Sequence, residues 1–299
     1  MSQPRVSVCL PVYNGEQFVA EAIRSVLAQD FADFELIITD NASTDGTADI
    51  CRQWCRADPR VRYHRAPVNR GLAANHNWGV ELARCPYLMW LGHDDLIAPE
   101  LISRCAQQLD QNPDVVLCYS YASYIDSQGR VTRRVEHENI GAGSSPSERF
   151  ECIFDEDHLC DAIFGLMKTR VLRQTRLHGP FSDSDRVLLA EMGLRGRFVL
   201  VPEFLFFRRW HESQTTTRFR DERARSLIFD PGRSAKINLP LFRKSWEFFL
   251  AVGRAPLPWK DRIRCWRRQY LWTKWTRHRF AREFVREAGA LKSRLLGVS

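Results

Sequence analysis

The first 120 residues alternate between short runs typical of strands and longer runs typical of helices, and this alternation constrains the fold most. Strand-like apolar runs occupy residues 5–11, 34–40, 61–65, 86–92 and 115–120. Helical spacing of apolar residues occupies 16–29, 47–54, 72–84 and 100–109. Strands that alternate with helices require crossover connections, which produce a parallel sheet covered on both faces. We therefore predict an α/β fold with a mostly parallel sheet flanked by helices.

Polar residues follow three of these strands directly. Tyr13 and Asn14 come after the first strand, residues 40–43 (DNAS) end and follow the second, and residues 93–95 (HDD) follow the fourth. Ligands of open α/β sheets bind outside the carboxyl ends of the strands. The three strand exits therefore predict one site. The plain alternative at the second exit is a helix cap by Ser43 or Thr44.

The third exit predicts a cation site. Neither G-x-G-x-x-G nor the P-loop motif occurs, so a phosphate bound here needs a divalent ion or an arginine. Asp94 and Asp95 offer hard oxygen ligands for Mg²⁺ or Mn²⁺, and two adjacent carboxylates repel each other unless a cation lies near. The alternative is that one of the two caps the helix that follows.

The positive charge is concentrated at the end of the chain. Residues 240–299 hold 15 Lys/Arg and 4 Asp/Glu, a net +11, whereas residues 1–239 hold 29 Lys/Arg and 32 Asp/Glu, a net −3. We predict a main domain over 1–239 and a basic, Trp-rich helical extension over 240–299. This extension either caps the domain or lies on an anionic membrane surface. No nucleic-acid module accompanies the charge, so nucleic acid is not expected as a partner.

The chain shows no signal-peptide pattern at its start and no apolar run long enough to cross a bilayer. Its nine cysteines are scattered and odd in number, which favours buried thiols over a disulfide framework. We expect a cytoplasmic protein, peripheral on the inner face of the membrane if the extension binds lipid. A Gly/Ser/Pro-rich loop at 137–149 is predicted as a mobile segment near the site.

Three stretches carry a resemblance to a known family: residues 6–47 (VSVCLPVYNG to DNASTDGT), 69–83 (NRGLAANHNWGVELA) and 87–95 (YLMWLGHDD). They resemble the nucleotide-sugar half of family 2 glycosyltransferases with the GT-A fold, over about residues 5–120. A weaker resemblance covers 181–213. The resemblance implies a Rossmann-like nucleotide-binding half over 1–120 and an acceptor half over 121–239.

The resemblance also implies roles for single residues. The nucleotide-sugar site would comprise Pro11, Val12, Tyr13, Asn14, Asp40, Ser43, Arg70, Asn75 and Asp94. The metal site would comprise Asp94, Asp95 and His211. The catalytic base would be Asp185, eleven residues before Gly196, with Asp183 as its competitor.

Two departures from the family pattern bear on this interpretation. Gly92 stands where the family often has a first acid, and Ser184-Asp185 stands where it has a Glu-Asp pair. The resemblance implies an inverting, metal-dependent hexosyltransferase-like enzyme that uses a nucleoside diphosphate sugar, most simply a UDP-sugar, and a saccharide or lipid-linked acceptor. The alternatives are a sugar nucleotidyltransferase and a degenerate, non-catalytic sugar-nucleotide-binding module.

Overall fold

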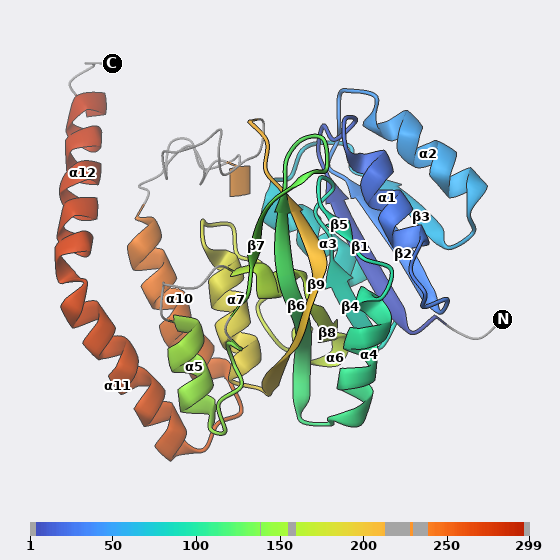
Figure 1. Ribbon diagram of the computed structural model, residues 1–299. Helices are drawn as coiled ribbons and strands as arrows, with labels where there is room; N and C mark the ends of the chain where they lie inside the picture. Colours follow the sequence, from blue (N-terminus) through green and yellow to red (C-terminus); the bar gives the residue numbers. More distant parts are fainter. Residues whose placement is uncertain (1–3, 138, 155–159, 213–227, 230–238, 296–299) are drawn as a thin grey trace.

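The structure is a computed structural model that describes residues 4–137, 139–154, 160–212, 228–229 and 239–295. Its first half alternates strands and helices, as the sequence predicts (Figure 1). The elements of this half are β1 (Val6–Val12), α1 (Val19–Leu27), β2 (Phe34–Asp40), α2 (Thr47–Ala57), β3 (Val61–Arg65), α3 (Leu72–Leu82), β4 (Tyr87–Trp90), β5 (Leu96–Ile97) and α4 (Leu101–Gln111). Those that follow are β6 (Val115–Ile125), β7 (Val131–Val135), α5 (Pro146–Phe154), the 3₁₀ helix η1 (Cys160–Phe164), β8 (Leu166–Lys168), α6 (Thr169–Leu172), α7 (Ser184–Gly193), β9 (Arg197–Arg209), α10 (Pro240–Arg254), α11 (Trp259–Trp275) and α12 (Arg277–Leu295).

The described strands form one sheet with the order β3-β2-β1-β4-β8-β6-β9-β5, and β7 pairs with β6. The pairs β1–β2, β1–β4 and β2–β3 are parallel. β8 runs antiparallel to both β4 and β6, so β4 and β6 run in the same direction, and β9 is parallel to β6. The carboxyl ends of β1, β2, β4, β6 and β9 therefore meet at one edge of the sheet. The predicted α/β sheet is confirmed.

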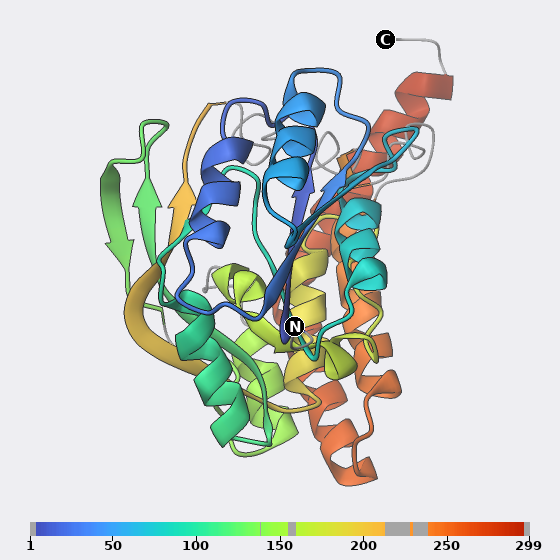
Figure 2. The same cartoon turned by 90° about the vertical axis from the view of Figure 1, so that its right-hand side faces the viewer.

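Helices cover both faces of this sheet because successive strand residues point to opposite sides. Val8 and Leu10 of β1 join a buried cluster with α1 and α4. Cys9, between them, joins a second buried cluster with α3, α5, α7 and α10. Figures 1 and 2 show α10, α11 and α12 beyond α7, on the side opposite α1 and α2. Phe248 of α10 is fully enclosed in the second cluster, so the extension shares the core of the main domain.

Several predicted boundaries are wrong. The first helix begins at Val19 rather than at residue 16, because a turn precedes it. Neither Ser43 nor Thr44 caps the second helix: Gly46 is its N-cap residue, and Asp45 Oδ1 accepts the backbone N–H of Thr47 at 3.1 Å. The sequence also did not predict β5, β7 or β8. These strands have two, five and three residues, which is too short for a periodic signal.

The prediction that residues 137–149 lie near the site is wrong for the later part of this segment. Gly141 O accepts the backbone N–H of Phe198, and Arg149 Nε donates to Gly193 O at 2.7 Å. The first contact lies at the start of β9 and the second at the end of α7. Both are therefore at the sheet edge opposite the polar strand exits. α5 begins at Pro146, inside the predicted loop.

The predicted domain boundary at residue 239 stays a prediction. Residues 213–227 and 230–238, which precede it, lie outside the described residues. Across the parts that are described, no helix has both the length and the apolar composition required to span a membrane.

Candidate active site

The loops after β1 and β2 form one continuous wall. Asn14 adopts a left-handed conformation with φ of 50°, and its backbone N–H donates to Ser43 Oγ at 3.0 Å. Its side-chain Oδ1 accepts the backbone N–H of Thr44 at 2.8 Å. Asn41 N–H donates to Val12 O at 2.9 Å. The structure thus brings together the predicted residues of the first two strand exits, with Pro11 and Val12 buried and Tyr13 45% exposed.

Asp40 lies behind this wall. Its carboxyl is fully buried, with Oδ1 accepting the backbone N–H of Ser43 at 2.8 Å and Oδ2 accepting Tyr63 O–H at 2.6 Å. Arg65 Nε lies 3.5 Å from the same Oδ2. Burial and this hydrogen bond raise the pKa of Tyr63, so the phenol stays a donor. Asp40 shapes the wall, and its contact with a nucleoside base stays a prediction.

Asn75 and Arg70 differ in exposure. Asn75 is only 3% exposed, and its Nδ2 donates to Thr39 O at 2.9 Å and to Val12 O at 3.4 Å, which ties β1 to β2. The exposed Arg70 side chain lies over Trp78, with the guanidinium carbon 4.5 Å from the ring centroid. Of the two, Arg70 is the one open to a phosphate.

Asp94 and Asp95 each use one oxygen for the protein and turn the other towards Gly92. Asp95 Oδ1 accepts the backbone N–H of Arg209 at 2.9 Å, and Asp94 Oδ2 lies 3.0 Å from His211 Nε2. A Cβ atom added at Gly92 would lie 2.6 Å from Asp95 Oδ2 and 2.9 Å from Asp94 Oδ1. The two carboxylates therefore fill the space of a side chain at position 92, and their other oxygens converge there.

The pKa values of Asp94 and Asp95 are shifted in opposite directions. Burial raises the pKa of Asp95 well above its usual value, and the charge of Asp94 raises it further. Burial also acts to raise the pKa of Asp94, but His93 and the hydrogen bond with His211 outweigh it and lower that pKa. Two close carboxylates repel each other when both are ionised, and a bound cation would reduce this repulsion.

Arg209, the last residue of β9, lies in the interior behind the acid pair. It is fully buried and lies with its guanidinium carbon 4.6 Å from the Phe18 ring centroid. Its Nε donates to Asp94 O at 2.8 Å, and its Nη2 pairs with Glu21 Oε2 at 2.7 Å. Nη1 donates to the backbone carbonyls of residues 126 and 127, both at 3.2 Å. Arg209 therefore anchors the end of β9 to α1, to the β6–β7 turn and to Asp94.

The two candidate bases sit differently at the start of α7. Asp183 has φ of 63°, is exposed, and accepts a hydrogen bond at Oδ2 from Lys244 Nζ at 3.0 Å; it makes no side-chain cap. Asp185, in the first turn, is partly buried, and its Oδ1 accepts the backbone N–H of Arg186 at 2.8 Å. Burial raises the pKa of Asp185, and the charge of Asp183 adds to this.

Arg208 links the two acidic groups of the site. For both Asp95 and Asp185, its positive charge offsets part of the effect of burial on the pKa, so it is within electrostatic reach of each. Its own partner is the buried Asp161 of η1, with which Nη1 forms an ion pair. Tyr124 O–H also donates to Asp161, at 3.2 Å. Sequence analysis missed Asp161 because no spacing connects it with β9.

The donor atoms fit a divalent ion that is shared with a ligand. No group of three or more His, Cys, Asp or Glu side chains suited to a metal ion occurs within the described ranges. Mg²⁺ in particular is held by one or two carboxylates together with substrate phosphates, rather than by a protein cage. Asp94 Oδ1 and Asp95 Oδ2 match that requirement, with His211 beside them.

The mostly parallel sheet, with a polar wall at β1 and β2 and paired acids after β4, defines a GT-A glycosyltransferase fold. The chain belongs to glycosyl transferase family 2, whose model matches residues 7–176. This match extends beyond the predicted resemblance over 5–120, but it excludes Asp185 and His211.

Relatives and solved structures agree with this family. The chain is 31% identical over 139 residues to the uncharacterised glycosyltransferase EpsJ of Bacillus subtilis, a match that covers 46% of this chain and 40% of EpsJ. The chain spans about half the length of the curated relatives it matches. S. aureus TarS, solved with UDP-GlcNAc, has a similar fold, with a TM-score of 0.65, 17% identity and coverage of 86% of this chain and 69% of that one. The mannosyltransferase PcManGT of Pyrobaculum calidifontis, solved with GDP-Man and Mn²⁺, has a TM-score of 0.52 at 16% identity, with coverage of 100% and 89%.

Proposed function

We propose that this chain is an inverting, metal-dependent glycosyltransferase that moves a hexose-like sugar from a nucleoside diphosphate sugar to an acceptor hydroxyl. The observation that carries this is that the positive charge of Arg208 acts on the pKa of both Asp95, in the acid pair after β4, and the partly buried Asp185 at the start of α7, so these acids belong to one site. The solved structures TarS, with UDP-GlcNAc, and PcManGT, with GDP-Man, support a donor of this class. A UDP-sugar is the first donor to test.

In this proposal the nucleoside binds along the wall made by residues 11–14 and 40–44. Asn14 and Ser43, which are hydrogen-bonded to each other, hold the wall in shape, and Asp40 fixes it from behind. The exposed Arg70 guanidinium meets the diphosphate. Asn75 acts by holding β1 against β2 rather than by touching the donor.

Asp94, Asp95 and His211 are proposed to hold Mn²⁺ or Mg²⁺ together with the diphosphate. When bound, the ion would neutralise the leaving group's charge. Asp94 is kept ionised by His93 and His211, which prepares one ligand. Burial and the charge of Asp94 raise the pKa of Asp95, and a bound cation would lower it again. Protein and nucleotide should therefore bind the ion together.

Asp185 is proposed as the base that takes the proton from the acceptor hydroxyl as that oxygen attacks the anomeric carbon opposite the diphosphate. Its raised pKa makes the carboxylate a stronger base than an exposed Asp. Asp183 is already engaged by Lys244, which favours a positioning role for it.

Neither alternative has an observation in its favour. The family model and the relatives are glycosyltransferases, not nucleotidyltransferases. Gly92 is no sign of a degenerate module, because the carboxylates of Asp94 and Asp95 occupy the space that a side chain at position 92 would fill.

Turnover of a nucleotide-sugar panel with Mn²⁺ tests the function. We expect release of one nucleoside diphosphate, and its loss with EDTA. If the protein binds nucleotide sugars but turns over none of the donors with a range of saccharide acceptors, this would instead support the non-catalytic module. An acceptor in polysaccharide or glycolipid biosynthesis would fit a protein at the inner membrane surface, and residues 240–299 are the proposed contact.

A further inference from the structure

The outer surface of α10–α12 is more basic than its composition suggests. Glu247, Glu283 and Glu287 are all buried, and Asp261, whose side chain is 19% exposed, pairs with Arg264. All four acids of the extension are therefore withdrawn from the surface or neutralised. Ten bases of the same helices are exposed. Three of them also form ion pairs, Arg254 with Glu191, Arg264 with Asp261 and Arg268 with Glu151. The other seven are Lys260, Arg267, Lys274, Arg277, Arg279, Arg282 and Arg286.

Large apolar side chains gather on the same helices. Of the thirteen exposed large hydrophobic residues among those described, nine are Phe242, Trp246, Phe249, Trp259, Ile263, Tyr270, Trp275, Phe284 and Val285. Isolated exposed apolar residues are ordinary on soluble proteins, whereas a concentration of them marks an interaction site. We call α10–α12 with these exposed bases and apolar residues the aromatic–basic face.

Two stacked ring pairs and one edge-to-face pair join α10 to α11 on this face. The ring centroids lie 5.5 Å apart for Trp246 and Phe249, 5.1 Å for Phe249 and Trp266, and 5.9 Å for Trp266 and Trp259. On α11, helical geometry puts Trp259, Ile263 and Tyr270 on one stripe, with Lys260 and Arg267 on the stripe beside it. An apolar stripe flanked by bases is the pattern of a helix that lies in a membrane interface.

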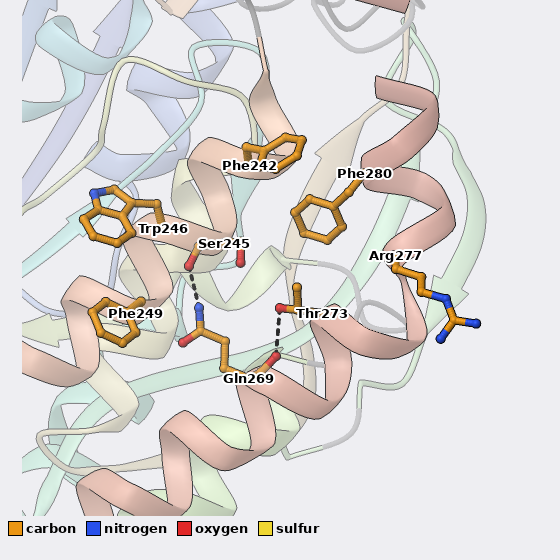
Figure 3. Close-up of a pocket in the computed structure, with 8 residues that line it drawn as sticks. All are labelled: Phe242, Ser245, Trp246, Phe249, Gln269, Thr273, Arg277 and Phe280. Carbon is orange, nitrogen blue, oxygen red and sulfur yellow. Dashed lines mark hydrogen bonds between the residues drawn. The ribbon is translucent and has the colours of Figure 1, made fainter. Parts of the chain in front are cut away.

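A groove of about 550 Å³ opens between α10 and the α11–α12 junction (Figure 3). Phe242 and Phe280 make an edge-to-face contact there with ring centroids 4.9 Å apart. Arg277 borders the same groove, with its guanidinium directed away from it. Gln269 also lines it; its Nε2 donates to Ser245 O at 2.5 Å, but its buried Oε1 has no partner among the described residues. The groove thus combines apolar walls with one hydrogen-bond acceptor that no described residue uses.

We propose that the aromatic–basic face docks on the surface of an anionic lipid bilayer, with the groove receiving part of a lipid. Trp and Tyr favour the membrane–water interface, and Lys and Arg near it are attracted to anionic headgroups. A second copy of the chain would meet this face with the same positive charge. A nucleic acid would leave the aliphatic side chains of Ile263 and Val285 uncovered, because only aromatic side chains stack on bases.

Docking on a bilayer would also bear on where the acceptor of the proposed function comes from, and this part of the inference rests on that function. Lys244 of α10 bonds Asp183 just before α7, and Arg254 pairs with Glu191 within α7. α10 is thereby fixed against the helix that carries Asp185. A lipid-linked acceptor in the bilayer would then approach the candidate base from the side of α10.

Sedimentation of the full chain with vesicles tests the docking. We expect binding to phosphatidylcholine vesicles that contain phosphatidylglycerol, little binding to phosphatidylcholine alone, and weaker binding in high salt. The double variant Lys260→Glu/Arg267→Glu should lower the partition coefficient about tenfold or more. Trp259→Ser/Tyr270→Ser should also lower it, and this loss should persist in high salt. The matched controls are Arg133→Glu and Val131→Ser on the exposed strand β7, which should leave binding unchanged.

Equal binding to both vesicle types, or equal effects of the control and face variants, would overturn the docking proposal. So would tighter binding to a single-stranded oligonucleotide than to anionic vesicles, or a dimer that only the face variants dissociate. Calorimetry with UDP and Mn²⁺ separates the two proposals, because the face variants should bind nucleotide as the wild type does. Vesicle binding by a protein that uses no nucleotide sugar would end the proposed function and leave the docking standing.

Discussion

Replacement of Arg209 by Met tests whether one buried side chain holds the candidate site together. The guanidinium donates to the carbonyls of Asp94 and of residues 126 and 127, and it pairs with Glu21. Met keeps the apolar part of the side chain beside Phe18 but provides no donor. The change removes the polar contacts while it preserves most of the packing.

The expected loss of stability follows from these contacts. Three carbonyl acceptors lose their donor, and each such loss costs about 1 kcal/mol. The Glu21 ion pair adds little, because the Glu21 side chain is 43% exposed and screened by water. The free energy of unfolding should therefore fall by about 3 kcal/mol, which lowers Tm by about 5 °C in a chain of this length. Asp94 would also lose an anchor, so UDP affinity in Mn²⁺ should fall.

Differential scanning calorimetry measures the first effect and isothermal titration with UDP and Mn²⁺ the second. Arg133→Met on the exposed strand β7 is the matched control, and its unfolding free energy should change by about 0.5 kcal/mol or less. A wild-type Tm for Arg209→Met would refute the anchoring role. A lower Tm with unchanged UDP affinity at a temperature where the variant is folded would refute the support of Asp94.

Four further predictions concern the acids and Gly92. Asp185→Asn should lower kcat on the order of a hundredfold with little change in donor affinity, whereas Asp183→Asn should cost much less; the reverse order in steady-state kinetics would make Asp183 the base. Because the pKa of Asp185 is raised in the fold, its stabilising contribution is complete below the ordinary Asp pKa of about 3.9 and is lost as pH rises through the folded pKa. The free energy of unfolding of Asp185→Asn, measured by denaturant titration, should therefore rise relative to that of the wild type between pH 4 and pH 7. A difference in unfolding free energy that does not change with pH would contradict the burial argument. Asp94→Asn and Asp95→Asn should each abolish turnover and remove the Mn²⁺ dependence of UDP affinity, and equal UDP affinity with and without Mn²⁺ in the wild type would end the metal proposal. Gly92→Asp should weaken rather than strengthen Mn²⁺-dependent UDP binding in calorimetry, since its Cβ would meet the two carboxylates; tighter binding would show that the site lacks a third acid.

Local patterns in the sequence determined the architecture of the first half of the chain. The alternation of Val8, Cys9 and Leu10 between opposite faces follows from the two-residue period of a strand. Helical spacing fixed the helices between the strands, with errors of a few residues at their ends. The polar exits at Asn14, Ser43 and Asp94 also followed, because parallel strands bring their carboxyl ends to one edge.

Only the tertiary structure decided which of these polar residues serve the fold and which remain for a ligand. Arg209 and Asp94 are 115 residues apart in the chain, and their contact depends on β9 lying beside β6 at the same sheet edge. Asp185 and Asp95 come within reach of Arg208 for the same reason. On the extension, composition gave the net charge, but the helix packing decided that Glu247 points inward. Local periodicity reflects interactions between chain neighbours, whereas burial and ion pairing depend on which distant segments meet.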